Sequence, residues 1–542
     1  MNMRTLFLRR FELERQKKPA LVLIKKDGHS VNYTWEAYEE AAIAISEGLK
    51  KEGVKKRDFV AIIPLNLPES FFALWGTILA EATPVPIHAQ LVRQAGQTDL
   101  KKILNDCKPK LILANKHLGE YLTEIKHLTV EEILVRGEMT CYNKKISIDQ
   151  IHADLNQQES YPEPEKKQEE ILIMPYTSGT SGNPKGVMLS HKNISDRIEA
   201  VNKELGTVPN ERILSYLPLG HISELIATLF GQIYGGYTVF FTEYAAEAVA
   251  DREKLKANFP AILQKVRPTV FLGVPKVWIN FRREIENRTN NLPVWARLIT
   301  TFFKRRLAKK GLGFQDTRIF ISTGSKLNRE EREFFRDLFG LDILDIYGQT
   351  EIAGPLTING RVIGQTQAML SGAEREIVIS GNCVMAGYYE NEEANKKVFS
   401  RDADGKRLYH SGDQGVTLFG NKIFCAGRLG DDFKLANGEF VTLDKIETLE
   451  EKIKRLDPRI IEAIVCGADK PYVVAIIFCD DCLDGDLNHK IRETLPGIGE
   501  GMFNPKNFAL VKADKLELTP TLKVKRKVML KKLESVIDSL YP

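Results

Sequence analysis

The chain has 542 residues, of which 43% are hydrophobic and 27% are charged, and its formal net charge is +5. This length exceeds what one hydrophobic core normally supports, so at least two domains are expected. The small net charge argues against a nucleic-acid partner, and no apolar run approaches the ~20 residues that span a bilayer, so the cytoplasm is the expected location.

The first hundred residues alternate between helical and extended patterns. Between Thr34 and Gly53, apolar residues recur at helical spacing, with a threonine at the start and a glycine at the end as caps. The following elements are predicted by the same reasoning: a strand at 59–63, a helix at 68–80, a strand at 84–87, a helix at 100–106 and a strand at 111–114. Such alternation predicts an α/β fold with mostly parallel sheets covered by helices. The polar segment 138–170 predicts a surface excursion.

Directly after the apolar run Ile171–Met174 comes a loop rich in hydroxyls and glycines: Tyr176-Thr-Ser-Gly-Thr-Ser-Gly-Asn-Pro-Lys-Gly186. Glycines let a backbone approach a ligand closely, hydroxyls donate to oxygens, and a lysine supplies a point charge. We interpret this loop as a cradle for a polyphosphate. It lacks the Walker spacing, and a flexible linker is the alternative.

This loop resembles the phosphate-binding signature of the acyl-adenylate-forming superfamily, which comprises acyl-CoA synthetases, peptide-synthetase adenylation domains and firefly luciferases. The resemblance covers nearly the whole chain through several motifs in the family's order. It implies that the β- and γ-phosphates of ATP contact Thr177, Ser178, Gly179, Thr180, Ser181, Gly182 and Lys185.

Two further segments point to the acyl substrate. Leu217-Pro-Leu-Gly-His221 looks like the motif that places a histidine or aromatic residue between the acyl site and the thiol path; a buried structural histidine is the alternative. Arg267-Pro-Thr-Val-Phe-Leu-Gly-Val-Pro-Lys-Val-Trp278 is similar to the long-chain acyl-CoA synthetase pattern, which normally has arginine where Lys276 stands. Its apolar residues could equally belong to the core.

Two motifs resemble the family's adenine and magnesium elements. Ser322-Thr-Gly-Ser325 corresponds to the turn along the adenine ring, so Gly324 and Ser325 are expected there. In Tyr347-Gly-Gln-Thr-Glu351, the tyrosine and Gly348 would border the adenine and Thr350 would reach the α-phosphate. Glu351, with Thr180, would bind Mg²⁺. The family commonly has leucine where Gln349 stands.

The ribose and the domain boundary come next. Tyr409-His-Ser-Gly-Asp413 resembles the Thr-Gly-Asp element, whose aspartate accepts both ribose hydroxyls, and Arg428 corresponds to a nucleotide-binding arginine. Relatives usually have Asp or Lys where Gly430 stands, and that residue is their hinge. The segment Phe433–Glu439, with Lys434, is expected to swing inward for thioester formation.

Past Arg428 the pattern changes to a helix at 444–456, strands at 460–465 and 472–479, and one terminal helix carrying Met529, Leu533, Val536 and Leu540. We therefore expect an N-terminal domain at 1–429 and a small, mobile α+β domain at 430–542. Leu518-Thr-Pro-Thr-Leu-Lys523 resembles the terminal lysine motif, whose charge offsets the charge developing at the α-phosphate. A basic helix start is the alternative.

Cysteines and one basic cluster give no strong signal. Cys479 and Cys482 form a lone C-x-x-C pair without a nearby histidine, so a zinc site is not expected. The basic residues between Lys304 and Lys310 fit a solvated helix face, with peripheral contact to an anionic membrane as the alternative.

The resemblance therefore implies an acyl-CoA synthetase for medium- or long-chain fatty acids, using ATP, Mg²⁺ and coenzyme A. The expected catalytic residues are Lys523, Glu351, Thr177 and His221. Four alternatives stay open: an acyl carrier protein as the thiol acceptor, an enzyme that stops at the adenylate, a luciferase-like oxidation of a special acid, and a nucleotide-binding regulator without turnover.

Overall fold

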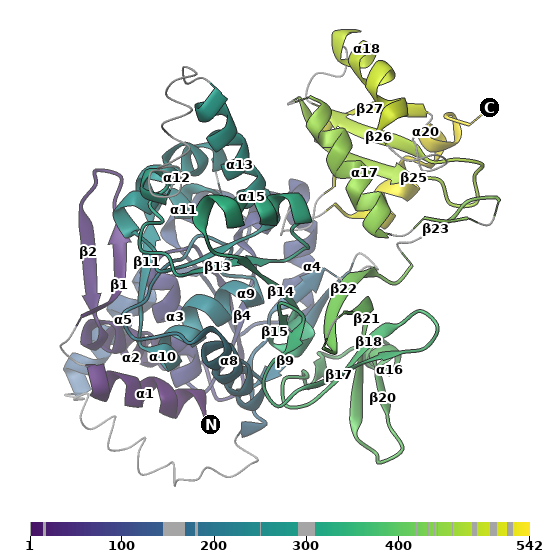
Figure 1. Ribbon diagram of the computed structural model, residues 1–542. Coiled ribbons are helices and arrows are strands. Elements are labelled where there is room, and N and C mark those ends of the chain that lie inside the picture. The colour runs from purple at the N-terminus through teal and green to yellow at the C-terminus, as the bar shows by residue number, and fades with distance from the viewer. Residues whose placement is uncertain are drawn as a thin grey trace.

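The computed structural model describes residues 2–14, 18–144, 168–178, 183–249, 251–290, 309–418, 420–430, 433–437, 439–441, 443–457, 459–479, 485–498, 507–517 and 524–541. Figure 1 shows a large N-terminal region and a smaller C-terminal unit beside it. The segments Gly179–Gly182 and 518–523 lie outside the described residues, as do residues 145–167 and 291–308.

Three sheets of the N-terminal region are mostly parallel and carry helices, as predicted. The first has the order β10-β11-β1-β2, the second β4-β3-β5-β6 and the third β12-β13-β14-β15-β16. Their strands are β1 (Pro19–Ile24), β2 (Ser30–Thr34), β3 (Phe59–Ile63), β4 (Thr83–Pro86), β5 (Leu111–Ala114), β6 (Leu128–Thr129), β10 (Arg212–Leu214), β11 (Thr238–Thr242), β12 (Val270–Gly273), β13 (Ile319–Thr323), β14 (Ile343–Gln349), β15 (Gly354–Ile358) and β16 (Arg361–Val362). All neighbours pair in parallel except β1/β2, β14/β15 and β15/β16.

Two antiparallel sheets complete this region, and sequence reasoning did not predict them. One has the order β17-β18-β21-β20 with β22 also on β21; the other has the order β19-β9-β7 with β8 also on β9. Their strands are β7 (Ile171–Ile173), β8 (Tyr176–Ser178), β9 (Pro184–Ser190), β17 (Gln367–Ser371), β18 (Glu376–Ser380), β19 (Gly387–Tyr388), β20 (Phe399–Arg401), β21 (Arg407–Leu418) and β22 (Lys422–Arg428).

Helices cover the parallel sheets, and their caps follow from local sequence. Helix α2 begins where Thr34 Oγ1 accepts a hydrogen bond from the backbone N–H of Ala37 at 3.1 Å. The helices of the N-terminal region are α1 (Met3–Glu14), α2 (Trp35–Lys51), α3 (Pro68–Leu79), α4 (Thr98–Cys107), α5 (Val130–Lys144), α8 (His191–Leu205), α9 (Ile222–Glu224), α10 (Gly231–Gly235), α11 (Glu243–Glu247), α12 (Arg252–Val266), α13 (Pro275–Asn290), α15 (Arg329–Phe339) and α16 (Glu392–Val398). The start of the predicted polar excursion, 138–144, belongs to α5.

The segment that resembles the long-chain synthetase pattern forms core. Phe271 and Trp278 are 1% and 0% exposed and pack with Phe314 and Phe335 in a cluster between β12, β13 and the helices α13 and α15. Burial of such aromatic side chains is a large source of stability. The positions of Phe271 and Trp278 are therefore explained by packing alone.

The C-terminal unit has its own small sheet, with the order β25-β26-β27. Along β26, Val474, Ile476 and Phe478 pack toward the terminal helices, while the alternate residues pack toward α17 and α18. The elements are β23 (Phe433–Lys434), β24 (Phe440–Val441), α17 (Leu443–Leu456), β25 (Ile460–Cys466), β26 (Val474–Cys479), α18 (Gly485–Thr494), β27 (Asn507–Lys512), α19 (Arg526–Lys532) and α20 (Glu534–Asp538). One expectation was wrong: the terminal helix is broken at Leu533, which has φ −102° and ψ 12° and joins two short helices.

Candidate functional site

A hairpin holds the two flanks of the glycine-rich loop. Strand β8 pairs antiparallel with β9, so that Thr177 lies opposite Lys185 and Ser178 lies opposite Pro184. Residues 179–182 connect these flanks and lie outside the described part of the chain. The pairing brings Thr177 and Lys185 to the same cavity.

That cavity has a volume of about 370 Å³ and gathers residues from distant parts of the chain. The predicted site residues that line it are Thr177, Lys185, His221, Gly324, Gly348, Thr350, Glu351 and Arg428. They come from five separate motifs, so the tertiary structure brings these eight predicted residues together at one cavity.

Asp413 forms a dense hydrogen-bonded cluster at one side of the cavity. Strands β21 and β22 pair Asp413 with Arg428, and Arg428 Nε lies 3.0 Å from Asp413 Oδ1. The hydroxyl of Tyr347 donates to Asp413 Oδ2 at 2.7 Å, and Gln349 Nε2 donates to the same oxygen at 2.5 Å. A carboxylate has about four lone-pair positions, so three donors leave about one for a ligand.

Burial keeps one donor of this cluster, the hydroxyl of Tyr347, protonated. Burial, with the charge of Asp413 added, raises the pKa of Tyr347 well above its ordinary value. Gln349 accepts from the hydroxyl of Tyr409 at 2.7 Å while donating to Asp413. A leucine at position 349 could make neither bond, so the departure from the family pattern adds polar contacts here.

Glu351 has a different neighbour, which sequence reasoning missed. The hydroxyl of Tyr388 donates to Glu351 Oε1 at 2.9 Å, and Lys185 Nζ lies 4.9 Å from the centre of the Tyr388 ring. Burial, followed by the charge of Glu351, raises the pKa of Tyr388, so this hydroxyl remains a donor. Tyr388 therefore connects the phosphate-loop lysine to the carboxylate expected to bind magnesium.

Steric constraints explain why glycine stands at two positions of the site, Gly348 and Gly324. A Cβ on Gly348 would lie 2.0 Å from the carbonyl oxygen of Gly354, because β14 and β15 approach closely there. Gly324 has φ +93°, a conformation that side-chain-bearing residues rarely adopt. Both backbones border the cavity.

His221 lies at the start of α9. Its Nδ1 accepts from the backbone N–H of Ser223 at 3.3 Å and lies 2.7 Å from Ser223 Oγ. These contacts orient the ring at the edge of the cavity. Glu224, three residues later, is 1% exposed and accepts from the hydroxyl of Ser215 at 2.6 Å.

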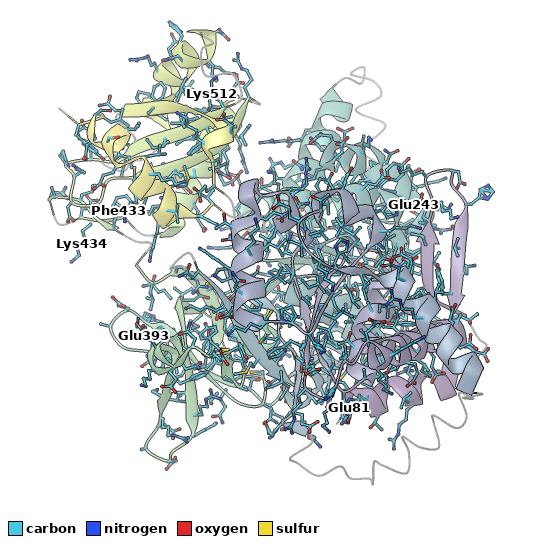
Figure 2. All side chains as sticks on the ribbon, turned by 180° about the vertical axis from the view of Figure 1, so that it is seen from behind. Glu81, Glu243, Glu393, Phe433, Lys434 and Lys512 are labelled. Atoms are coloured by element: carbon cyan, nitrogen blue, oxygen red, sulfur yellow. The ribbon has the colours of Figure 1, made fainter. Side chains whose placement is uncertain are left out.

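Other predicted residues lie elsewhere. Ser325 is exposed in the turn after β13 and does not line the described part of the cavity. Lys434 belongs to β23, and Figure 2 shows it at the outer edge of the C-terminal unit, away from the N-terminal region. Gly179, Thr180, Ser181, Gly182 and Lys523 lie outside the described residues.

The cavity also contains residues to which the sequence analysis gave no role: Glu376, Tyr388, Lys397, Tyr409 and His410. Glu376 accepts from the backbone N–H of Gly412 at 2.9 Å and lies 2.9 Å from His410 Nδ1. Tyr409 and His410 stand inside the segment that ends at Asp413, so that motif was a signal for them. Tyr388 had no such local signal.

Comparison with known proteins fits this geometry. The family model described as AMP-binding enzyme matches residues 8–389. The chain belongs to the AMP-binding enzyme family. Long-chain-fatty-acid–CoA ligase ACSBG2 of Rattus norvegicus is 28% identical over 504 residues, which cover 83% of this chain and 73% of that protein. The peroxisomal long chain acyl-CoA synthetase 7 of Arabidopsis thaliana is 26% identical over 500 residues, covering 80% and 67%.

Solved structures of other proteins share the fold of this chain. McyG A-PCP complexed with phenylalanyl-adenylate aligns over 100% of this chain and 85% of its own, with a TM-score of 0.77 at 16% identity. The adenylation domain of a Mycobacterium chelonae carboxylate reductase aligns over 100% and 91%, with a TM-score of 0.77 at 19% identity. The predicted family and adenylate-forming fold are confirmed, and enzymes of this family use ATP and CoA.

Proposed function

We propose that this AMP-binding enzyme activates a medium- or long-chain fatty acid in two steps. A carboxylate oxygen would attack the α-phosphorus of ATP, giving acyl-AMP and pyrophosphate. The thiol of coenzyme A would then attack the acyl carbon and release AMP. The observation that supports this most is the single cavity that gathers Lys185, Glu351 and Arg428, with Asp413 paired to the last.

The proposed nucleotide contacts follow the geometry around that cavity. Thr177, Ser178, Lys185 and the residues 179–182 between them would hold the β- and γ-phosphates, and Thr350 would reach the α-phosphate. Gly324, Ser325, Tyr347 and Gly348 would border the adenine. Since the hydroxyl of Tyr347 is bonded to Asp413, its ring is held in one orientation.

The ribose is proposed to bind at Asp413 and Arg428. Because three donors already occupy Asp413, accepting both ribose hydroxyls requires one of these donors to move. Arg428 is the candidate, since its side chain is 46% exposed, whereas Gln349 is also held by the hydroxyl of Tyr409. The arginine would then be available to the phosphates.

The carboxylate of Glu351 fits magnesium. Mg²⁺ usually takes one or two protein carboxylates and completes its shell with water and phosphate oxygens. Tyr388 occupies one oxygen of Glu351, which leaves lone pairs on the other; Thr180 is the second proposed ligand. Bound there, Mg²⁺ would neutralise phosphate charge.

The two steps are proposed to need different orientations of the C-terminal domain, residues 430–542. Lys523 would stabilise the charge of the first transition state, and Lys434 would enter for the second. Gly430 has φ +78°, which glycine adopts more readily than Asp or Lys. This backbone conformation supports a hinge at Gly430, because glycine favours the orientation of the C-terminal domain that the structure has.

Thioester formation needs little base catalysis. A thiol with a pKa near ~8.5 supplies some thiolate at neutral pH, and AMP is a good leaving group. His221, at the cavity edge, is proposed to lie between the acyl group and the thiol. Closure over the adenylate would protect the mixed anhydride from water.

An assay of ATP–pyrophosphate exchange across carboxylic acids of increasing chain length tests the first step. Exchange that is greatest with medium or long fatty acids is the expected result. No exchange with any acid would refute the proposal and favour a nucleotide-binding regulator. Competition between coenzyme A and an acyl carrier protein in a thioester assay identifies the acceptor.

Residence in the cytoplasm, with peripheral contact at the membrane, stays a prediction. Across the described ranges, the helices are too short or too polar for a membrane span. Of the basic cluster, Lys304, Arg305 and Arg306 lie outside those ranges, and Lys309 and Lys310 lie inside them. Co-sedimentation with anionic and neutral vesicles would test peripheral contact.

A further inference from the structure

Ion pairs join the C-terminal unit to the N-terminal region at two separate places. On α17, Arg455 Nη1 lies 2.7 Å from Glu330 Oε2, and the same guanidinium also pairs with Glu331. Before α19, Lys525 Nζ lies 3.3 Å from Asp99 Oδ2 on α4. The two contacts together hold the unit in the orientation seen in Figure 1.

The Asp99–Lys525 pair and the Glu331 side of the Arg455 contact are shielded from water, whereas Glu330 is 68% exposed. The side chains of Asp99 and Lys525 are 15% and 18% exposed, and that of Glu331 is 1% exposed and also pairs with Arg282 at 3.2 Å. Ion pairs in such settings are screened less by solvent than exposed pairs, whose contribution is small. Removing one charge from either contact should therefore weaken the docking of the C-terminal unit by a measurable amount.

The helix that carries Asp99 also holds the phosphate loop. Lys102 Nζ donates to Asn183 Oδ1 at 3.0 Å, at the start of the strand after the loop. Asp106 Oδ2 accepts from the hydroxyl of Tyr176 at 2.5 Å, on the strand before it. Residues 99, 102 and 106 are spaced to lie on one face of a helix. One helix thus contacts both flanks of the loop and the C-terminal unit.

We infer that Asp99 is a positioning residue for the adenylation step, acting by docking Lys525 and with it the C-terminal unit beside the phosphate loop. This rests on the proposed function. Lys525 follows Lys523, the lysine proposed to act in the first step, by two residues in the sequence. The outward position of Lys434 supports the same assignment, because the second step would need that residue inside.

The test separates the two half-reactions in the full-length enzyme. Asp99→Asn keeps the side-chain volume and removes the charge. Loss of a shielded, charge-assisted hydrogen bond should slow ATP–pyrophosphate exchange about 10- to 100-fold. Thioester formation from supplied acyl-adenylate should be unchanged or faster, because the unit must leave this orientation for that step.

Matched variants isolate the ion pair. Lys101→Gln, on the same helix, breaks only an exposed pair with Glu124 and should leave both steps unchanged. Arg455→Gln should reproduce the selective loss from the other contact. The double variant D99K with K525D restores opposite charges and should recover exchange to within about threefold of wild type.

A second readout needs no substrate. Freeing the C-terminal unit should speed tryptic cleavage after Arg428 and Lys434 in Asp99→Asn, but not in Lys101→Gln. Equal loss of both half-reactions, or unchanged exchange together with unchanged cleavage, would overturn the inference. A wild-type enzyme that shows no exchange would instead refute the proposed function, and the cleavage rates would still decide on the ion pair.

Discussion

Glu224 is a buried acid whose protonation should set how the stability of this protein depends on pH. Its side chain accepts from the hydroxyls of Ser215, at 2.6 Å, and Thr228, at 3.4 Å. Burial raises its pKa from an ordinary value of 4.5 to about 8, although both hydroxyls act in the opposite direction. At neutral pH the folded protein therefore keeps a proton that the unfolded chain has released.

The sign and size of the effect follow from linkage. Between pH 4.5 and 8 folding takes up a proton, so this group makes the native state less stable as the pH rises through that window. One pKa unit corresponds to about 1.4 kcal/mol, so the penalty at pH 7 is about 3 kcal/mol. Glu224→Gln removes the ionisation and keeps the shape.

The assay is denaturant unfolding of wild type and Glu224→Gln at pH 5, 6, 7 and 8. We expect the variant to gain stability over wild type by about 1.4 kcal/mol for each pH unit. Glu374→Gln, in the exposed turn between β17 and β18, is the matched control and should show no such trend. A stability difference that is flat with pH would refute the reasoning.

Three further variants test the site. Lys523→Ala should slow ATP–pyrophosphate exchange by about 100-fold or more and spare thioester formation from supplied acyl-adenylate; equal loss in both assays would contradict the domain rotation. Tyr388→Phe removes the hydroxyl on Glu351, and exchange should fall about tenfold with a higher Mg²⁺ requirement; an unchanged Mg²⁺ titration would argue against the proposed ligand. In Gly348→Ala the new Cβ meets backbone at 2.0 Å, so thermal unfolding should show a loss of about 1–3 kcal/mol, whereas Gly119→Ala, with open space around it, should unfold like wild type.

Local signals predicted the N-terminal elements well. The helix expected between Thr34 and Gly53 is found as Trp35–Lys51 with the predicted threonine cap, and the strand at 59–63 is found as Phe59–Ile63. Capping and apolar periodicity depend on neighbours within a few residues. The prediction of one terminal helix was wrong for a related reason. The apolar spacing continues past Leu533, but the helical conformation of the backbone is interrupted there.

Long-range contacts were the part that local patterns could not supply. Gln349 was an unassigned departure from the family pattern, yet it bonds to Tyr409 and Asp413, 60 and 64 residues away. Tyr388, bonded to Glu351 from 37 residues away, had no motif around it. Both depend on how β14, β19 and β21 meet at the cavity.

The sequence by itself determined the family, the helix-covered parallel sheets and eight of the residues that line the cavity, since glycines, hydroxyls and charges at fixed spacing are needed by nucleotide chemistry. Only the tertiary structure decided the partners of Asp413 and Glu351 and the docking of Lys525 on α4. Those contacts join segments up to 426 residues apart. Their geometry follows from sheet order and from the orientation of the C-terminal unit, which local residue spacing does not encode.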